Sequence, residues 1–190
     1  MSVHLTGPAL HRVRAGTPAA QRRSRRDERR RLARHDRVAA QLVELHSIRA
    51  VLEAATTVIS SGWVQHGWFT VAGTAGGQRM VTAYNMEVVS DAPLSGACLV
   101  GAIVHAAGGP SAAKTQLTQR TLDLAWHALH HDASQPVRWC PAPAIRAAHL
   151  RDLTRWNDHG GRTFDQVTAL MHSAVRVAAA NTERLQASVR

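Results

Sequence analysis

The sequence is poor in cysteine, in aromatic side chains and in long apolar runs. Its 190 residues include only two cysteines, Cys98 and Cys140, which lie far apart and in no metal-ligand spacing. A disulfide scaffold is therefore not expected, and a reduced cytoplasmic interior suits this cysteine usage better. We likewise predict no metal site and no bound cofactor.

No apolar segment is long enough to cross a membrane. The longest such run, residues 94–109 (LSGACLVGAIVHAAGG), contains His105 and is bounded by glycine. It is shorter than the run of about 18 apolar residues that indicates a transmembrane helix. The arginines of RRSRR resemble a twin-arginine export signal, but charged residues follow where such a signal needs an apolar stretch. We therefore expect a soluble, cytoplasmic protein without a membrane span.

The positive charge is concentrated at the beginning of the chain. Of the formal net charge of +10, residues 1–40 contribute +8, with eleven arginines against three acidic residues. Residues 41–190 contribute +2 and are nearly neutral. We therefore predict a basic, Arg-rich tail over 1–40, expected to be mobile, and a helical domain over 41–190.

Two segments of the tail differ in composition. Residues 1–20 contain two Gly and two Pro among small and polar residues, which is typical of disorder. Residues 21–39 contain good helix formers and no Gly or Pro, but their like charges repel one another. This second segment is expected to be conditionally helical.

The arginine density of the tail favours an anionic partner. Several guanidinium groups can contact several phosphates, and such binding gains from counterion release. The tail has no aromatic residue, so base stacking is not offered. An anionic protein surface, a membrane surface and a merely solvated tail or start-site extension are the alternatives. The candidate nucleic-acid-binding residues are Arg22, Arg23, Arg25, Arg26, Arg29, Arg30, Arg31 and Arg34.

The rest of the chain predicts a mainly α fold, a single domain of four or five helices with one small β-hairpin. Apolar residues recur at spacings of three and four from Leu45 to Ile59, which indicates a helix ending near Gly62. Thr163 and Gln166 form a capping-box pattern at the start of the last helix. The hairpin is expected at about 68–72 and 79–84, and the further helices at about 93–107, 112–130, 144–157 and 163–185.

Two groups of reactive side chains are candidates, one for a metal site and one for a nucleophilic pair. His127 and His131 are four residues apart, a spacing that can place two imidazoles on one metal, but no third ligand is obvious. Together with His130 they also suit a helix C-terminus, so their role stays open. Cys98 and His105 lie two helical turns apart, about 10 Å, which is too far for a nucleophilic pair.

The densest group of functional residue types is LTRWNDHGGRT, residues 153–163. As a helix–helix connection, the tryptophan packs against the next helix, the asparagine and aspartate bind backbone amides, and the two glycines permit positive φ. That structural interpretation explains most of the segment. The alternative is a ligand or catalytic site formed by Trp156, Asn157, Asp158 and Arg162.

Three segments together resemble a known family. They are VLEAATTVISSGWVQHGW (51–68), GACLVGAI (96–103) and LTRWNDHGGRTFDQVTALMHSAV (153–175). They look like an actinobacterial family of short proteins catalogued as a domain of unknown function, with Gly-Trp, C-x-x-G-A and WND-x-x-GRT motifs. Val64 and Gln166 depart from that pattern, which often has a cysteine and an acidic residue there. The resemblance covers about residues 50–180 and implies domain boundaries, but no activity.

The leading functional hypothesis is a small, non-enzymatic accessory or interaction protein whose tail engages nucleic acid. It rests on the +8 tail beside a nearly neutral domain. The rival is a small enzyme or ligand-binding domain that uses the WNDHGGRT junction. A partner-dependent module, such as part of a toxin–antitoxin pair, is a third possibility, and the residues indicate no oligomeric state.

Overall fold

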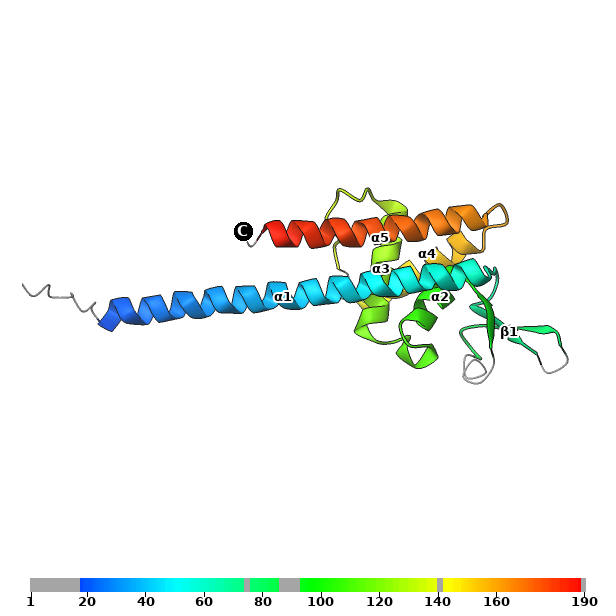
Figure 1. Cartoon of the computed structure of the whole chain (residues 1–190), viewed down its shortest axis with the longest axis horizontal. Helices are drawn as coiled ribbons and strands as arrows, with labels where there is room; N and C mark the ends of the chain where they lie inside the picture. The colour runs from blue at the N-terminus through cyan, green and yellow to red at the C-terminus, as the bar shows by residue number, and fades with distance from the viewer. Residues whose placement is uncertain (1–17, 74–75, 86–92, 140–141, 189–190) are drawn as a thin grey trace, which may run out of the picture. The chain divides into compact units, whose positions relative to one another are not determined.

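The computed structural model describes residues 18–73, 76–85, 93–139 and 142–188 (Figure 1). Contacts within the chain divide it into two units, residues 1–37 and 38–190. In the first unit the described residues are helical and belong to α1 (Pro18–Ser61), which ends in the second unit. Disorder was predicted for residues 1–20, of which 1–17 fall outside the described ranges, whereas 18–20 belong to α1 and correct the prediction there.

Helix α1 is continuous from Pro18 to Ser61, whereas a conditional helix followed by a separate domain helix was predicted. Residues 18–61 contain no glycine and no proline after the first position, so nothing in the backbone interrupts the helix. The predicted apolar face is confirmed, because Ile48, Leu52, Ala55 and Ile59 are fully buried. The helix ends at Ser61, directly before Gly62, as expected.

A small antiparallel sheet follows α1. Strands β1 (Phe69–Ala72) and β2 (Gln78–Val81) form the predicted hairpin, and β3 (Leu94–Ala97) pairs with the other edge of β1. The strand order is β2-β1-β3. The third strand corrects the prediction of a helix from 93, because periodicity cannot distinguish a short apolar strand from a buried helix.

Helix α2 (Leu99–Ala106) is the centre of the core. Its residues 99–104 are all buried, as expected for a helix that is apolar on every side. Gly108 and Gly109 follow with φ of 119° and 83°, a left-handed backbone that stops the helix. A 3₁₀ turn, η2 (Pro110–Ala112), then precedes α3 (Gln116–His130), so the predicted helix from 112 begins four residues later.

Two long helices complete the domain, α4 (Pro143–Asn157) and α5 (Phe164–Ala187). The capping box of Thr163 and Gln166 is present in full at the start of α5. Helix α3 packs against both α4 and α5, and α2 packs against α3 and α4 (Figure 1). The described residues thus form a mainly α fold with five α-helices and a three-stranded sheet. None of these helices combines the length and apolar character that a membrane crossing requires.

Candidate functional site

Asn157, at the end of α4, lies at the centre of a buried hydrogen-bond group. Its Oδ1 accepts from Trp63 Nε1 at 2.9 Å and from the backbone N–H of Leu99 at 3.2 Å. Its Nδ2 donates to the carbonyl of Val64 at 3.1 Å and to Asp158 Oδ1 at 2.8 Å. An amide side chain has two donor and two acceptor positions, so all four are filled by the protein.

The same junction holds the segment that follows α1. Asp158 Oδ1 also accepts from the backbone N–H of His66 at 2.9 Å, where His66 has a φ of 62°. Gln65 Nε2 donates to the carbonyls of Asn157 and His159 at 2.9 and 3.0 Å. These bonds fix a left-handed residue that would otherwise be unfavourable for a side chain with a Cβ.

Arg162 stabilises the turn from the other side. Its guanidinium lies 3.9 Å from the ring centroid of Trp156, and its Nε donates to the Trp156 carbonyl at 3.0 Å. A second nitrogen donates to Gln166 Oε1 at 2.9 Å, which joins the arginine to the capping box. The glycines at 160 and 161, which would permit positive φ, do not adopt it. The turn is held by the Thr163 cap and by the contacts of the Arg162 guanidinium.

The three motifs of the family resemblance meet at this junction. Trp63 of the Gly-Trp motif binds Asn157 of the WND motif, and that same amide caps the N-terminus of α2. Cys98, the N-cap of α2, accepts from the N–H of Gly101 at 3.3 Å through its sulfur. Burial raises the pKa of Cys98 to about 12, against the backbone N–H groups that lower it. The three motifs therefore form a structural cluster, which we call the clamp. In it, Asn157 joins α4 to Trp63 and to Leu99 at the start of α2.

A cleft of about 710 Å³ lies elsewhere, beside α3, α4 and the segment after α3. Within it, His149 Nδ1 lies 3.0 Å from Asp123 Oδ1, and Arg146 Nε donates to Asp123 Oδ2 at 3.3 Å. The carboxylate is 3% exposed, so both oxygens need these partners. The described lining residues are Asp123, Trp126, His127, His131, Gln135, Pro136, Arg138, Trp139, Ile145 and His149.

The Asp123–His149 contact favours one tautomer of the imidazole. Asp123 Oδ2 accepts from Arg146 Nε, and Asp123 Oδ1 lies where it can accept a proton carried on His149 Nδ1. The Nε2 atom is then the basic nitrogen of the ring. No local motif predicts this pair, because the two residues are 26 positions apart on different helices.

Trp126 organises the imidazoles around the cleft. Its indole stacks on His149 with ring centroids 3.8 Å apart and an interplanar angle of 14°. The rings of His130 and His131 lie 4.6 and 5.7 Å from the same indole. The indole N–H donates to Asp152 Oδ2 at 3.2 Å, which fixes the ring plane. One aromatic side chain therefore positions several histidines.

His127 is a buried histidine with an unfilled hydrogen-bond position. It is 6% exposed, and its Nε2 has no hydrogen-bond partner in the described part of the chain. Burial lowers its pKa from 6.5, the nearby His131 and Arg184 act in the same direction, and the backbone of Gln135 opposes them. The described ranges contain no group of three side chains placed to hold a metal ion. The geometry thus gives His127 a neutral ring beside the cleft.

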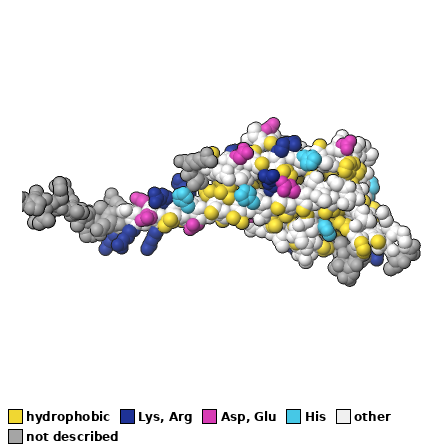
Figure 2. All heavy atoms as spheres, in the orientation of Figure 1, with side chains coloured by type: hydrophobic (Ala, Val, Ile, Leu, Met, Phe, Trp, Pro, Cys, Tyr) yellow, Lys and Arg dark blue, Asp and Glu magenta, His cyan; other side chains and the backbone are white. Residues whose placement is uncertain are grey.

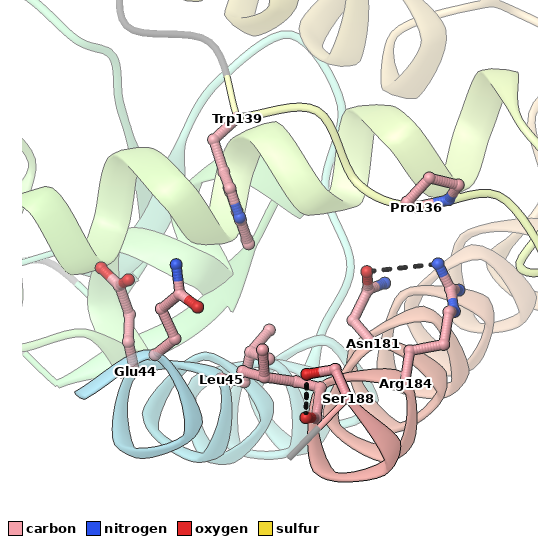
Figure 3. A pocket seen from close by; sticks show the side chains of 9 residues that line it. Glu44, Leu45, Pro136, Trp139, Asn181, Arg184 and Ser188 are labelled. Atoms are coloured by element: carbon pink, nitrogen blue, oxygen red, sulfur yellow. Dashed lines mark hydrogen bonds between the residues drawn. The ribbon is translucent and has the colours of Figure 1, made fainter. Parts of the chain in front are cut away.

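A smaller pocket of about 250 Å³ lies between α1 and α5 (Figure 3). Trp139 points into it, and Asn181 and Arg184 lie on its α5 side. Arg184 is already bound to Asn181 Oδ1 at 3.5 Å and to the Ala133 carbonyl at 2.8 Å. Through its bond to the Ala133 carbonyl, Arg184 joins α5 to the segment after α3.

The arginines of the first unit form two rows on α1. Arg22, Arg25, Arg26 and Arg29 recur at helical spacings of three and four, and all four side chains are exposed. Arg30, Arg31 and Arg34 are also exposed and surround Asp27. Figure 2 shows dark blue Lys and Arg side chains on the N-terminal part of α1. Arg23 lies in the same helix, but its side chain is outside the described set.

These features define a small helical domain with a clamped core and a histidine-rich cleft, joined to an arginine-rich helical segment. The chain belongs to a family of unknown function, DUF6197, whose family model matches residues 43–177. The matched range contains the clamp and the cleft, whereas the arginine rows precede it. Neither a curated protein nor a solved structure matches the chain.

Proposed function

We propose that this chain is a small accessory protein that binds nucleic acid through the arginine rows of α1. The observation that carries the proposal is the row Arg22, Arg25, Arg26 and Arg29, whose exposed side chains share one helical face. Over seven residues a helix rises about 10 Å, so this row can follow several phosphates of one backbone.

The chemistry of the row favours the phosphate backbone over the bases. Guanidinium groups bind phosphate oxygens in a bidentate manner, and they release counterions whatever the base sequence. Aromatic residues are absent from positions 1–40, so single strands gain nothing from stacking there. We therefore propose sequence-independent binding to duplex nucleic acid, by a protein located in the cytoplasm.

The test compares two full-length variants with the same change in net charge. In the first, the row Arg22, Arg25, Arg26 and Arg29 is changed to Gln. In the control, four exposed arginines of the second unit are changed to Gln, namely Arg79, Arg151, Arg155 and Arg176. Binding of a short fluorescent DNA duplex is followed by anisotropy across salt concentrations, and circular dichroism checks the helix content.

We expect the row variant to lose at least about tenfold in affinity, and the logarithmic salt slope to fall by about 0.9 for each phosphate contact removed. The control variant should retain the affinity and the slope of the wild type. Equal losses in both variants would show that net charge alone is responsible. Salt-independent binding by the wild type would also contradict the proposal.

The alternative function places a ligand at the junction of Trp156, Asn157, Asp158 and Arg162. Asn157 has every polar position filled, and Arg162 is bound to Trp156 and Gln166. A ligand there would have to displace these bonds. The cleft beside α3 and α4, which has an unfilled histidine nitrogen, is a better place for ligand chemistry.

A further inference from the structure

We propose that the cleft beside α3 and α4 is an acid–base site that cleaves RNA by internal transesterification, with His149 as the base and His131 as the acid. This activity goes beyond the proposed binding function, because residues 123–149 line the cleft and the arginine rows do not. The inference starts from His149, whose ring is held by Asp123 and by the indole of Trp126.

His149 has the arrangement of a general base. Its Nδ1 is held by Asp123 at 3.0 Å, and its ring is held flat against Trp126. The carboxylate keeps the proton on Nδ1 and stabilises the imidazolium that forms when Nε2 takes up a second proton. His149 is among the residues that line the cleft, so we place the bound hydroxyl at its Nε2.

His131 supplies a second proton-transfer group in the same cleft. The ring centroid of His131 lies 5.7 Å from that of Trp126, whose indole stacks on His149. The side chain of His131 is exposed. An imidazole in contact with solvent can exchange its proton between turnovers. Arg138, also exposed and on the cleft lining, offers a guanidinium to a phosphate oxygen.

The composition of the lining selects the type of reaction. Among the described lining residues there is no serine, threonine, cysteine or lysine that could act as a covalent nucleophile. Asp123 is engaged by Arg146 and His149, so we assign the nucleophile to the substrate. Cleavage next to a 2′-hydroxyl needs a base, an acid and a cation beside the phosphate, and these are the three groups that His149, His131 and Arg138 provide.

The step is balanced without any further reactant. His149 Nε2 removes the proton of the 2′-hydroxyl, and O2′ forms a bond to the adjacent phosphorus. The bond from phosphorus to O5′ breaks, and O5′ takes its proton from His131. The products are a 2′,3′-cyclic phosphate and a 5′-hydroxyl, with His149 protonated and His131 neutral, and exchange with water restores both.

Two further observations suit a nucleotide in this cleft. The buried Nε2 of His127 has no partner in the described residues, which leaves a hydrogen-bond position for a base or sugar group. Trp139, half-buried on the lining, offers an aromatic ring to a base. The volume of about 710 Å³ also falls within the usual range of about 300–1,000 Å³ for small-molecule sites.

The experiment uses the full chain and single-stranded RNA that contains every dinucleotide step, with the chelator EDTA present. The same oligonucleotide with 2′-O-methyl groups lacks the nucleophile and serves as the substrate control. Mass spectrometry identifies the new ends. The variants are His149→Gln, His131→Gln and, as a matched control, His172→Gln, an exposed histidine of α5 outside the cleft.

We expect the wild type to cleave RNA to 2′,3′-cyclic phosphate ends and to leave the methylated strand intact. His149→Gln and His131→Gln should each lower kcat/KM by about 100-fold or more, while His172→Gln stays within about twofold. Intact RNA with the wild type, equal cleavage of the methylated strand, or full activity in both cleft variants would overturn the proposal. If His149→Gln fails to fold by circular dichroism, the exposed His131 variant decides the outcome.

Discussion

Trp63 Nε1 donates a 2.9 Å hydrogen bond to Asn157 Oδ1, across 94 positions of sequence. The bond joins the segment after α1 to the last residue of α4. The same oxygen accepts from Leu99, the first residue of α2, so three parts of the domain meet at one amide. Asn157 is fully buried, and water cannot replace these partners without opening the core.

Replacing Asn157 by Ala should therefore be costly. The change leaves the Trp63 indole N–H, the Leu99 N–H and the Val64 carbonyl without that partner in a buried site. Unsatisfied buried groups cost about 1–3 kcal/mol each, with partial relaxation, so we expect the free energy of unfolding to fall by about 2–4 kcal/mol. Urea denaturation measures the change.

The control for this substitution is Asn85→Ala. Asn85 Oδ1 accepts from the backbone and the hydroxyl of Thr82 within one local turn. Its loss should cost about 1 kcal/mol or less, because the turn can relax toward solvent. Equal costs at both positions would mean that the long-range clamp contributes nothing beyond an ordinary side-chain cap.

The thiol of Cys98 should be inert in the folded protein. Burial raises its pKa to about 12, so its thiolate fraction at pH 8 is of the order of one in 10⁴. In a Cys140→Ser chain, where Cys98 is the remaining cysteine, iodoacetamide should add no label to the native protein and one label in denaturant. Mass spectrometry counts the labels, and rapid native labelling would show that α2 opens readily.

His127 should make stability depend on pH. Burial lowers its pKa from 6.5, so the folded chain resists protonation that the unfolded chain accepts. Well above pH 6.5 the ring is neutral in both the folded and the unfolded chain, so its titration does not change the free energy of unfolding. As the pH falls below 6.5, the unfolded chain gains the proton first, and stability is lost until the folded pKa is reached.

The measurement compares unfolding free energies of the wild type and His127→Gln from pH 8 down to about pH 5. The wild type should lose stability more steeply than the variant over the acidic part of this range. His172→Gln, at an exposed position of α5, should keep the slope of the wild type. A slope unchanged by His127→Gln would show that its ring is protonated as easily in the fold as in the unfolded chain.

Features that depend on neighbouring residues were predictable from the sequence. The capping box of Thr163 and Gln166 needs a spacing of three, and the buried face of α1 needs a period of 3.6. Both signals are local, so they survive whatever the rest of the chain does. The junction at Asn157 was also expected to bind backbone groups, and it does.

Features that depend on distant pairing were not predictable. Strand β3 is defined by its pairing with β1, and its four small or apolar residues look the same as the start of a helix. The Asp123–His149 pair joins two helices at a separation of 26 residues. Its members carry no local pattern, whereas the histidines at 127 and 131 are recognisable by their spacing of four residues.

Gly101 of the C-x-x-G-A motif and Gly160, a variable position inside WND-x-x-GRT, should respond in opposite ways to the same substitution. A Cβ at Gly101 would lie 2.1 Å from the carbonyl oxygen of Trp68, and backbone atoms cannot turn aside as a side chain does. A Cβ at Gly160 would meet nothing within 4 Å, and Gly160 does not adopt positive φ. Gly101→Ala should therefore destabilise the domain by about 1–3 kcal/mol or more through overpacking.

Gly160→Ala should stabilise the domain by about 0.4–1 kcal/mol, because alanine restricts the unfolded chain without straining the folded one. The two substitutions change the unfolded state alike, so the difference between their urea midpoints reports the folded environment. Similar effects at both positions would show that α2 does not approach Trp68 closely. Opposite signs would mean that the C-x-x-G-A glycine is fixed by the distance between α2 and the chain before β1, whereas Gly160 in the WND-x-x-GRT segment is not required by local geometry.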